Sequence, residues 1–202
     1  MACCGVQNLK HNKVRDYDDD ELDVLIIGLE GAGKTLLIRR LQSLHNPSRK
    51  VNPQTFPTSG TETNEIACQP HPRFSKIWAR EVGGCMAPIW YKYYEECRSV
   101  LFVIDATNGQ AAQAAAGQLQ ALLPHESLKG KPCLLVLNKI DATNALPRSE
   151  LDSLIGLPKL MDTCTGRFDV LEVSALEGKN DWAVLAWLVE SKLSRQSKPQ
   201  PS

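Results

Sequence analysis

The feature that most limits how this chain can fold is a glycine-rich segment that directly follows a short apolar run. Residues 24–27 read Val-Leu-Ile-Ile, a continuous branched run that is typical of a strand buried on both faces. Residues 28–35 then read Gly-Leu-Glu-Gly-Ala-Gly-Lys-Thr, and a stretch with helical character follows. Because glycines let backbone N–H groups converge at the start of a helix, this order of elements predicts a phosphate-binding loop.

The residues of this loop have separate predicted roles. Lys34 is expected to contact the β- and γ-phosphates of a nucleotide as a point charge, and the Thr35 hydroxyl is expected to bind Mg²⁺. The remaining nucleotide-binding positions of the loop are expected at Gly28, Glu30, Gly31, Ala32 and Gly33. The alternative is a glycine-rich turn beside a solvated lysine, which fits less well with a strand before the segment and a helix after it.

Apolar runs and helical stretches alternate along the rest of the chain. Further strands are predicted at residues 100–104, 133–137 and 168–173, and helices at residues 34–44, 111–123, 149–157 and 180–193. Residues 62–67 and 76–82 are expected to pair as a hairpin, and the proline-containing residues 46–60 to form a long loop. The alternation predicts a three-layer α/β fold with a mostly parallel six-stranded sheet, helices on both faces and its ligand at the carboxyl ends of the strands.

Length and composition limit the domain organisation and the partners. We expect one domain at residues 22–193 of the 202, with a flexible polar and acidic leader at 1–21 and a disordered tail at 194–202. Lys and Arg together number 23, as do Asp and Glu, so no net charge favours nucleic acid and we expect no nucleic-acid partner. We also expect a monomer. Seven cysteines without a Cys-x-x-Cys pair favour a reduced, cytoplasmic setting.

Two later segments predict how a base is recognised. Residues 138–141, Asn-Lys-Ile-Asp, directly follow a predicted strand. The Asp141 carboxylate can accept two parallel hydrogen bonds from guanine, whereas adenine lacks that pair of donors. Lys139 is expected to lie over the purine ring, and Asn138 to connect this segment to the phosphate-binding loop. After the last strand, Ser174 and Ala175 are expected to place a backbone N–H near the guanine oxygen.

The segments between these motifs contain candidates for sensing the γ-phosphate. Glu81, at the end of a predicted strand, is expected to bind Mg²⁺ through a water, and the amide of Gly84 to donate to the γ-phosphate. Thr58 is the candidate for the hydroxyl that completes the magnesium shell when the γ-phosphate is present. Three other threonines compete for this role, at Thr55, Thr61 and Thr63.

Residues 22–193 resemble the small GTPases of the Ras superfamily and, among them, the ADP-ribosylation factor (Arf) branch. The resemblance rests on the opening of the phosphate-binding loop at residues 28–30, on Pro57-Thr58 with Gly60, and on Val82-Gly83-Gly84 followed by Pro88-Ile89-Trp90 and Tyr93. It implies the P-loop NTPase fold of the small G proteins, with GTP or GDP and Mg²⁺ as ligands. It also implies an effector protein that recognises the GTP-bound form. An exchange factor, an activating protein and a role in membrane or ciliary traffic are implied in the same way.

This chain departs from the family pattern at the position of the catalytic glutamine. Cys85 stands there, and a thiol is too short and too weak a hydrogen-bonding group to orient the attacking water. We therefore expect GTP hydrolysis to be slower by on the order of 10² or more, and we name no certain catalytic residue. A constitutively GTP-loaded interaction module that does not cycle is the alternative, and a P-loop ATPase or kinase, which shares only residues 28–35, is a third.

The surfaces toward effectors and membranes also depart from the family. Thr61 and Arg80 replace two members of an aromatic trio of which Tyr93 remains, so effectors that bury the usual trio are expected to bind poorly. Trp78 is expected to pack beneath the hairpin. The alternative is that Trp78 offers effectors an aromatic side chain in place of the two that are replaced. Acylation of Cys3 and Cys4 would give at most weak peripheral contact, for example at Golgi or ciliary membranes.

Overall fold

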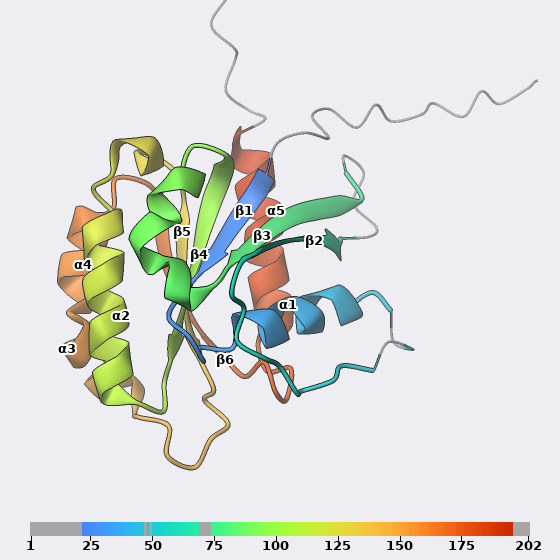
Figure 1. Ribbon diagram of the computed structural model, residues 1–202, viewed down its shortest axis with the longest axis horizontal. Helices are drawn as coiled ribbons and strands as arrows, with labels where there is room; N and C mark the ends of the chain where they lie inside the picture. The colour runs from blue at the N-terminus through green and yellow to red at the C-terminus, as the bar shows by residue number, and fades with distance from the viewer. Residues whose placement is uncertain (1–21, 47, 49, 69–73, 196–202) are drawn as a thin grey trace, which may run out of the picture.

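A six-stranded sheet forms the centre of the molecule (Figure 1). The computed structural model describes residues 22–46, 48, 50–68 and 74–195. The strands are β1 (Leu22–Ile27), β2 (Thr61–Ala67), β3 (Lys76–Val82), β4 (Cys97–Asp105), β5 (Cys133–Asn138) and β6 (Phe168–Val173). Their spatial order is β2-β3-β1-β4-β5-β6, and only β2 runs antiparallel to its neighbour. The predicted P-loop NTPase architecture is confirmed.

Helices cover both faces of this sheet, as Figure 1 shows. One face packs on α1 (Lys34–Ser43) and α5 (Asp181–Arg195), and the other on α2 (Gly109–Leu122), α3 (Arg148–Ile155) and α4 (Leu157–Thr163). Side chains of β1 alternate between the two cores, because Val24 and Ile26 lie in one and Leu25 and Ile27 in the other. The strand is therefore buried on both faces, as its unbroken apolar run predicted.

The hairpin predicted from residues 62–67 and 76–82 is present as β2 and β3. Thr61 pairs with Val82 at one end and Ala67 with Lys76 at the other. Residues 69–73, between these two strands, lie outside the described residues. Trp78 is partly buried and packs against the core, with the Lys76 ammonium 4.7 Å from its ring centre, as the packing interpretation predicts.

Several boundaries differ from the prediction for local reasons. The helix expected at 149–157 ends at Ile155, because Gly156 adopts a left-handed φ of 64° and α4 begins after it. Two 3₁₀ helices, η1 (Gly84–Tyr93) and η2 (Glu126–Leu128), were not predicted. β6 is an edge strand whose residues are mostly half-buried, rather than a fully buried strand. Of the helices in the described ranges, none has the length and apolar character needed to cross a membrane.

Candidate nucleotide-binding site

The phosphate-binding loop lies between β1 and α1, at the carboxyl edge of the sheet. Gly33 precedes α1 with a φ of 91°, a conformation that favours glycine, and Gly31 has a φ of 75°. Gly28 is also required, because a Cβ there would lie 2.3 Å from the Val103 carbonyl oxygen. The loop therefore has the shape that its glycines predicted, with the start of α1 at its end.

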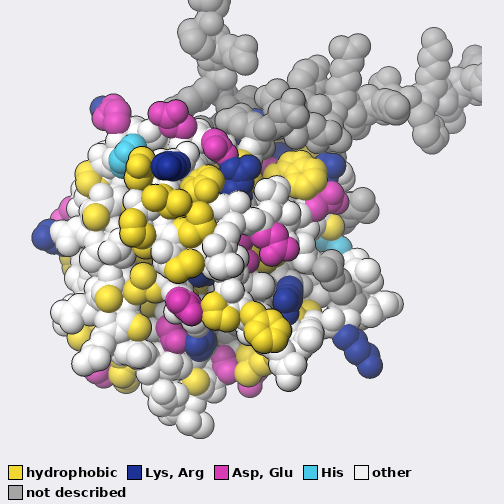
Figure 2. All heavy atoms as spheres, in the orientation of Figure 1, with side chains coloured by type: hydrophobic (Ala, Val, Ile, Leu, Met, Phe, Trp, Pro, Cys, Tyr) yellow, Lys and Arg dark blue, Asp and Glu magenta, His cyan; other side chains and the backbone are white. Residues whose placement is uncertain are grey.

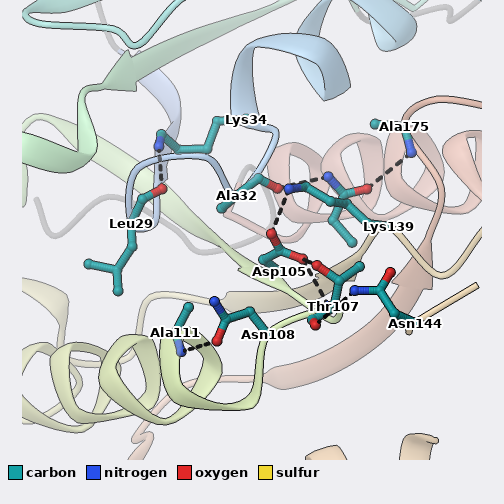
Figure 3. A network of polar contacts seen from close by, with 11 residues as sticks. Leu29, Ala32, Lys34, Asp105, Thr107, Asn108, Ala111, Lys139, Asn144 and Ala175 are labelled. Atoms are coloured by element: carbon teal, nitrogen blue, oxygen red, sulfur yellow. Dashed lines mark hydrogen bonds and ion pairs between the residues drawn. The ribbon is translucent and has the colours of Figure 1, made fainter. Parts of the chain in front are cut away.

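Lys34 lies under this loop and is 5% exposed. Its ammonium donates to the carbonyl oxygens of Gly28 at 2.8 Å and Leu29 at 3.0 Å; Figure 3 shows the Leu29 contact. Burial lowers the pKa of Lys34 from its ordinary value, while nearby Glu81 opposes the shift. The hydrogen bonds that this buried ammonium makes within the described part of the chain go to carbonyl oxygens, so a phosphate anion would stabilise it.

Two hydroxyls and one carboxylate meet beside Lys34. Thr35 Oγ1 donates to Glu81 Oε1 at 2.6 Å, and Thr58 Oγ1 lies 3.2 Å from the same oxygen. Glu81 is 1% exposed, and its other oxygen is buried without a hydrogen-bond partner among the described residues. A buried, partly unpaired carboxylate beside two hydroxyls fits a hard divalent cation such as Mg²⁺, which prefers oxygen ligands.

The position of Thr58 distinguishes it from the three competing threonines. Thr61 and Thr63 are exposed on β2, and Thr55 lines the pocket without a contact to Glu81 among those observed. Thr58 lies in the predicted long loop. Between the end of α1 and the start of β2, the described residues of this loop contain no helix or strand. This loop therefore reaches the phosphate-binding loop through the Thr58 hydroxyl.

The segment after β3 closes the same pocket. A Cβ at Gly84 would lie 2.2 Å from the Glu30 nitrogen, and one at Gly83 would lie 2.0 Å from the Thr58 carbonyl oxygen. Close backbone approach therefore explains both glycines. The pocket has a volume of about 180 Å³, and its lining comes from the phosphate-binding loop, the loop around Thr58, and Glu81 and Gly84. The Cys85 side chain is exposed, with its sulfur 3.7 Å from the Thr58 carbonyl oxygen.

Asn138 joins the base-binding segments to the phosphate-binding loop. Its Nδ2 donates to the Ala32 carbonyl at 2.8 Å, and its Oδ1 accepts from the Ala175 amide at 3.0 Å. A Cβ at Gly33 would lie 2.3 Å from this Nδ2. The connection predicted for Asn138 is therefore present, and it includes Ala175 as well. Ser174 is fully buried and its hydroxyl accepts from the Glu177 amide.

The two remaining residues of the base segment lie at the same edge. Asp141 has a carboxylate oxygen that is buried without a partner among the described residues, as expected of a group that accepts from a base. Lys139 has a φ of 69°, and its ammonium contacts Asp105 Oδ2 at 2.5 Å. The structure thus brings all predicted nucleotide-binding and metal-binding residues to one edge of the sheet.

Sequence reasoning missed two polar residues at this edge. Asp105 ends β4 and holds Lys139; its position directly after an apolar run was the available signal. Arg40 of α1 donates to the backbone carbonyls of Ala175 and Leu176, so it holds the last loop against the first helix. Arg40 had no local signal, because its two partners lie 135 and 136 residues further along the chain.

A phosphate-binding loop, a base segment and two closing loops on this sheet define a small GTPase, a nucleotide-binding switch. The model of the ADP-ribosylation factor family matches residues 9–192, and the chain belongs to this family. ADP-ribosylation factor-like protein 16 of Homo sapiens is 41% identical over 168 residues, covering 81% of this chain and 83% of that protein. Members of the family bind GTP and GDP.

Two further relatives agree with this assignment. ADP-ribosylation factor-like protein 1 of Saccharomyces cerevisiae is 30% identical over 176 residues, covering 84% of this chain and 87% of that protein. The solved structure of the Arl6 (BBS3) small GTPase of Trypanosoma brucei with the nucleotide analogue GppNp superposes with a TM-score of 0.70 at 26% identity. The match covers 87% of this chain and 99% of that one.

Proposed function

We propose that this protein is a guanine-nucleotide switch that binds GTP or GDP with Mg²⁺ and acts by binding an effector in its GTP form. The observation that carries the proposal is the shared contact of Thr35 and Thr58 with Glu81 Oε1. This shared contact joins the phosphate-binding loop to the long loop around Thr58 through the Glu81 carboxylate, a group of the kind that binds metal ions. A ligand that changes this contact would order or release the loop around Thr58.

Guanine selectivity is assigned to Asp141. Its unpaired, buried carboxylate oxygen supports a group that accepts hydrogen bonds from the base, while Asn138 holds the segment against the phosphate-binding loop. Bound Mg²⁺ would neutralise phosphate charge. Thr35, Thr58 and Glu81 would hold it, and Lys34 would contact the phosphates as a buried cation.

Hydrolysis of GTP is proposed to be very slow. Cys85 occupies the position from which the family's glutamine orients water, and its exposed thiol has a 3.7 Å contact with the Thr58 carbonyl. A thiol is a weak hydrogen-bonding group, so it supplies little orientation to a water. The protein would then depend on an activating protein to return to the GDP state.

The effector surface is proposed to lie over β3 and η1. Figure 2 shows hydrophobic side chains gathered on this face, over η1, the helix drawn bright green in Figure 1. Arg80 forms an ion pair with Glu96 and lies 5.8 Å from the Tyr93 ring, so a charged pair stands where the family has an aromatic. We propose an effector that binds the Arg80–Glu96 ion pair. We further propose that this protein acts in intracellular membrane or ciliary traffic, with weak membrane contact through its own Cys3 and Cys4.

The nucleotide content of freshly purified protein tests the proposal. Denaturation should release GDP or GTP in a ratio near one nucleotide per chain, and calorimetry of the stripped protein should detect binding of GDP and GTP with Mg²⁺. Adenine nucleotides in the extract, or a folded sample without affinity for guanine nucleotides, would contradict it.

The alternative, a GTP-loaded module that does not cycle, is favoured by the exposed thiol of Cys85 at the hydrolytic position. Single-turnover hydrolysis and nucleotide release distinguish the two functions. A chain that retains GTP and neither hydrolyses nor exchanges it within hours fits the module, whereas release or hydrolysis that a second protein accelerates fits the switch.

A further inference from the structure

Lys139 has a backbone conformation that a lysine rarely adopts. Its φ is 69°, in the left-handed region, directly after β5 ends at Asn138. A residue other than glycine in this region is strained, and such strain persists when the surroundings hold the residue in place. The side chain of Lys139 is 38% exposed, so burial alone does not hold it.

Asp105 supplies the contact that fixes the other end of this side chain. β4 and β5 pair so that Asp105 lies beside Asn138, one residue before Lys139. The Asp105 Oδ2 accepts from the Lys139 ammonium at 2.5 Å. Its Oδ1 accepts from the Thr107 amide at 2.9 Å and the Thr107 hydroxyl at 2.7 Å, as Figure 3 shows.

The loop that contains Asp105 is itself fastened to the base segment. The Ala106 amide donates to the Asn138 carbonyl at 2.9 Å, and the Leu146 amide donates to the Ala106 carbonyl at 2.9 Å. Asn144 Nδ2 adds a contact of 3.3 Å to the Thr107 carbonyl. The carboxylate therefore has a fixed position relative to the segment it contacts.

These contacts hold Lys139 at both ends, at its strained backbone and at its ammonium. The four-carbon stem between them is apolar, and a free lysine stem would lose much rotational freedom on being ordered against a ligand. We propose that Asp105 is a positioning residue that holds the Lys139 stem ready for the purine ring and thereby slows nucleotide release. This inference rests on the proposed guanine-nucleotide function.

The test is the rate at which a fluorescent GDP analogue leaves the full chain in excess Mg²⁺, chased with unlabelled GDP. Asp105→Asn keeps the shape of the side chain but removes its charge, and release should become faster by about tenfold, the scale of one ordered lysine side chain. Asp152→Asn is the matched control, since it removes a comparable carboxylate contact, 2.6 Å to Arg148, outside the pocket. Its release rate should stay within about twofold of that of the unmodified chain.

A double-mutant cycle separates positioning from a purely structural role. Lys139→Met keeps an unbranched stem and removes the ammonium that Asp105 holds. In this background Asp105→Asn should change release by less than about twofold, because the proposed effect acts through Lys139. An unchanged tenfold effect in the Lys139→Met background would overturn the inference in favour of a structural role.

A second variant covers the case in which Asp105→Asn does not fold. Thr107→Val removes the 2.7 Å contact through which the Thr107 hydroxyl orients the Asp105 carboxylate, and it leaves the charge of Asp105 in place. Release should become faster, by less than in Asp105→Asn, and the effect should again vanish with Lys139→Met. If the unmodified chain retains no guanine nucleotide, the proposed function fails; if it retains GDP while both variants release it at the unmodified rate, only this inference fails.

Discussion

The side-chain amide of Asn138, at the end of β5, donates a 2.8 Å hydrogen bond to the carbonyl of Ala32, 106 residues earlier in the chain. The oxygen of the same amide accepts from the Ala175 backbone at 3.0 Å. Asn138 is 1% exposed, so both contacts are shielded from water. One side chain therefore connects three loops.

Replacing Asn138 with Ala would leave a buried carbonyl and a buried amide without partners. We expect the free energy of unfolding to fall by about 2–4 kcal/mol, measured by urea denaturation. Asn144→Ala is the control, because Asn144 is exposed and makes a 3.3 Å contact; its effect should stay within about 0.5 kcal/mol. Equal losses in the two variants would contradict the connecting role of Asn138.

The strands and the nucleotide-binding segments were predictable because their signals are local. The apolar run at 133–137 became β5, and the residues that follow a strand in a parallel sheet must lie at its carboxyl edge. The end of the helix predicted at 149–157, and the start of the unpredicted α4 after it, also had a local signal, since Gly156 is followed closely by Pro158.

Contacts between distant segments could not be predicted in the same way. Asp105 precedes its partner Lys139 by 34 residues, and only the pairing of β4 with β5 brings them together. The approach of Thr58 to Glu81 likewise depends on the path of a loop without regular structure. Such contacts depend on strand order and loop closure, which no local pattern encodes.

Asp141→Asn tests the assignment of base selectivity. The substitution replaces one acceptor oxygen with a donor, so guanine affinity should fall by on the order of 10² or more and xanthine nucleotides should become the better ligands. Competition of GDP and XDP against a fluorescent GDP analogue measures both changes. Asp162→Asn, an exposed carboxylate on α4, should leave the preference unchanged. Intact guanine binding in Asp141→Asn would refute the assignment.

Removal of Mg²⁺ tests the role of Glu81. Chelation with EDTA should accelerate GDP release from the unmodified chain by about tenfold or more, since bound cation and phosphates stabilise each other. In Glu81→Gln the uncharged amide holds a cation poorly, so the ratio of release rates with and without EDTA should approach one. Glu62→Gln is the control: Glu62 pairs with Glu81 across β2 and β3 but is exposed. A full EDTA effect in Glu81→Gln would exclude the carboxylate from the cation site.

Asp105 also predicts a pH dependence of stability. Burial alone would raise the pKa of Asp105, but hydrogen bonds from Lys139 and Thr107 outweigh it and hold the pKa below its ordinary value. In acid the unfolded chain therefore binds more protons than the folded chain. The stabilisation that the Asp105 carboxylate contributes is complete above its unfolded pKa of about 3.9 and is lost as pH falls through its folded pKa. Asp105→Asn should be less stable than the unmodified chain near neutral pH, and the difference should shrink toward about pH 3. Urea unfolding across this range measures it, and a constant difference would contradict the sign.

Cys85→Gln tests whether the thiol is what makes hydrolysis slow. Cys85 is exposed and directly follows Gly84, which lines the pocket, so a longer side chain can extend there without displacing the core. A glutamine amide can orient water, and single-turnover hydrolysis of bound GTP should become faster by on the order of 10². Cys85→Ser supplies the matched control, since its hydroxyl is as short as the thiol and should leave hydrolysis slow. If Cys85→Gln hydrolyses GTP no faster than Cys85→Ser, the orientation of water by residue 85 is not what limits hydrolysis.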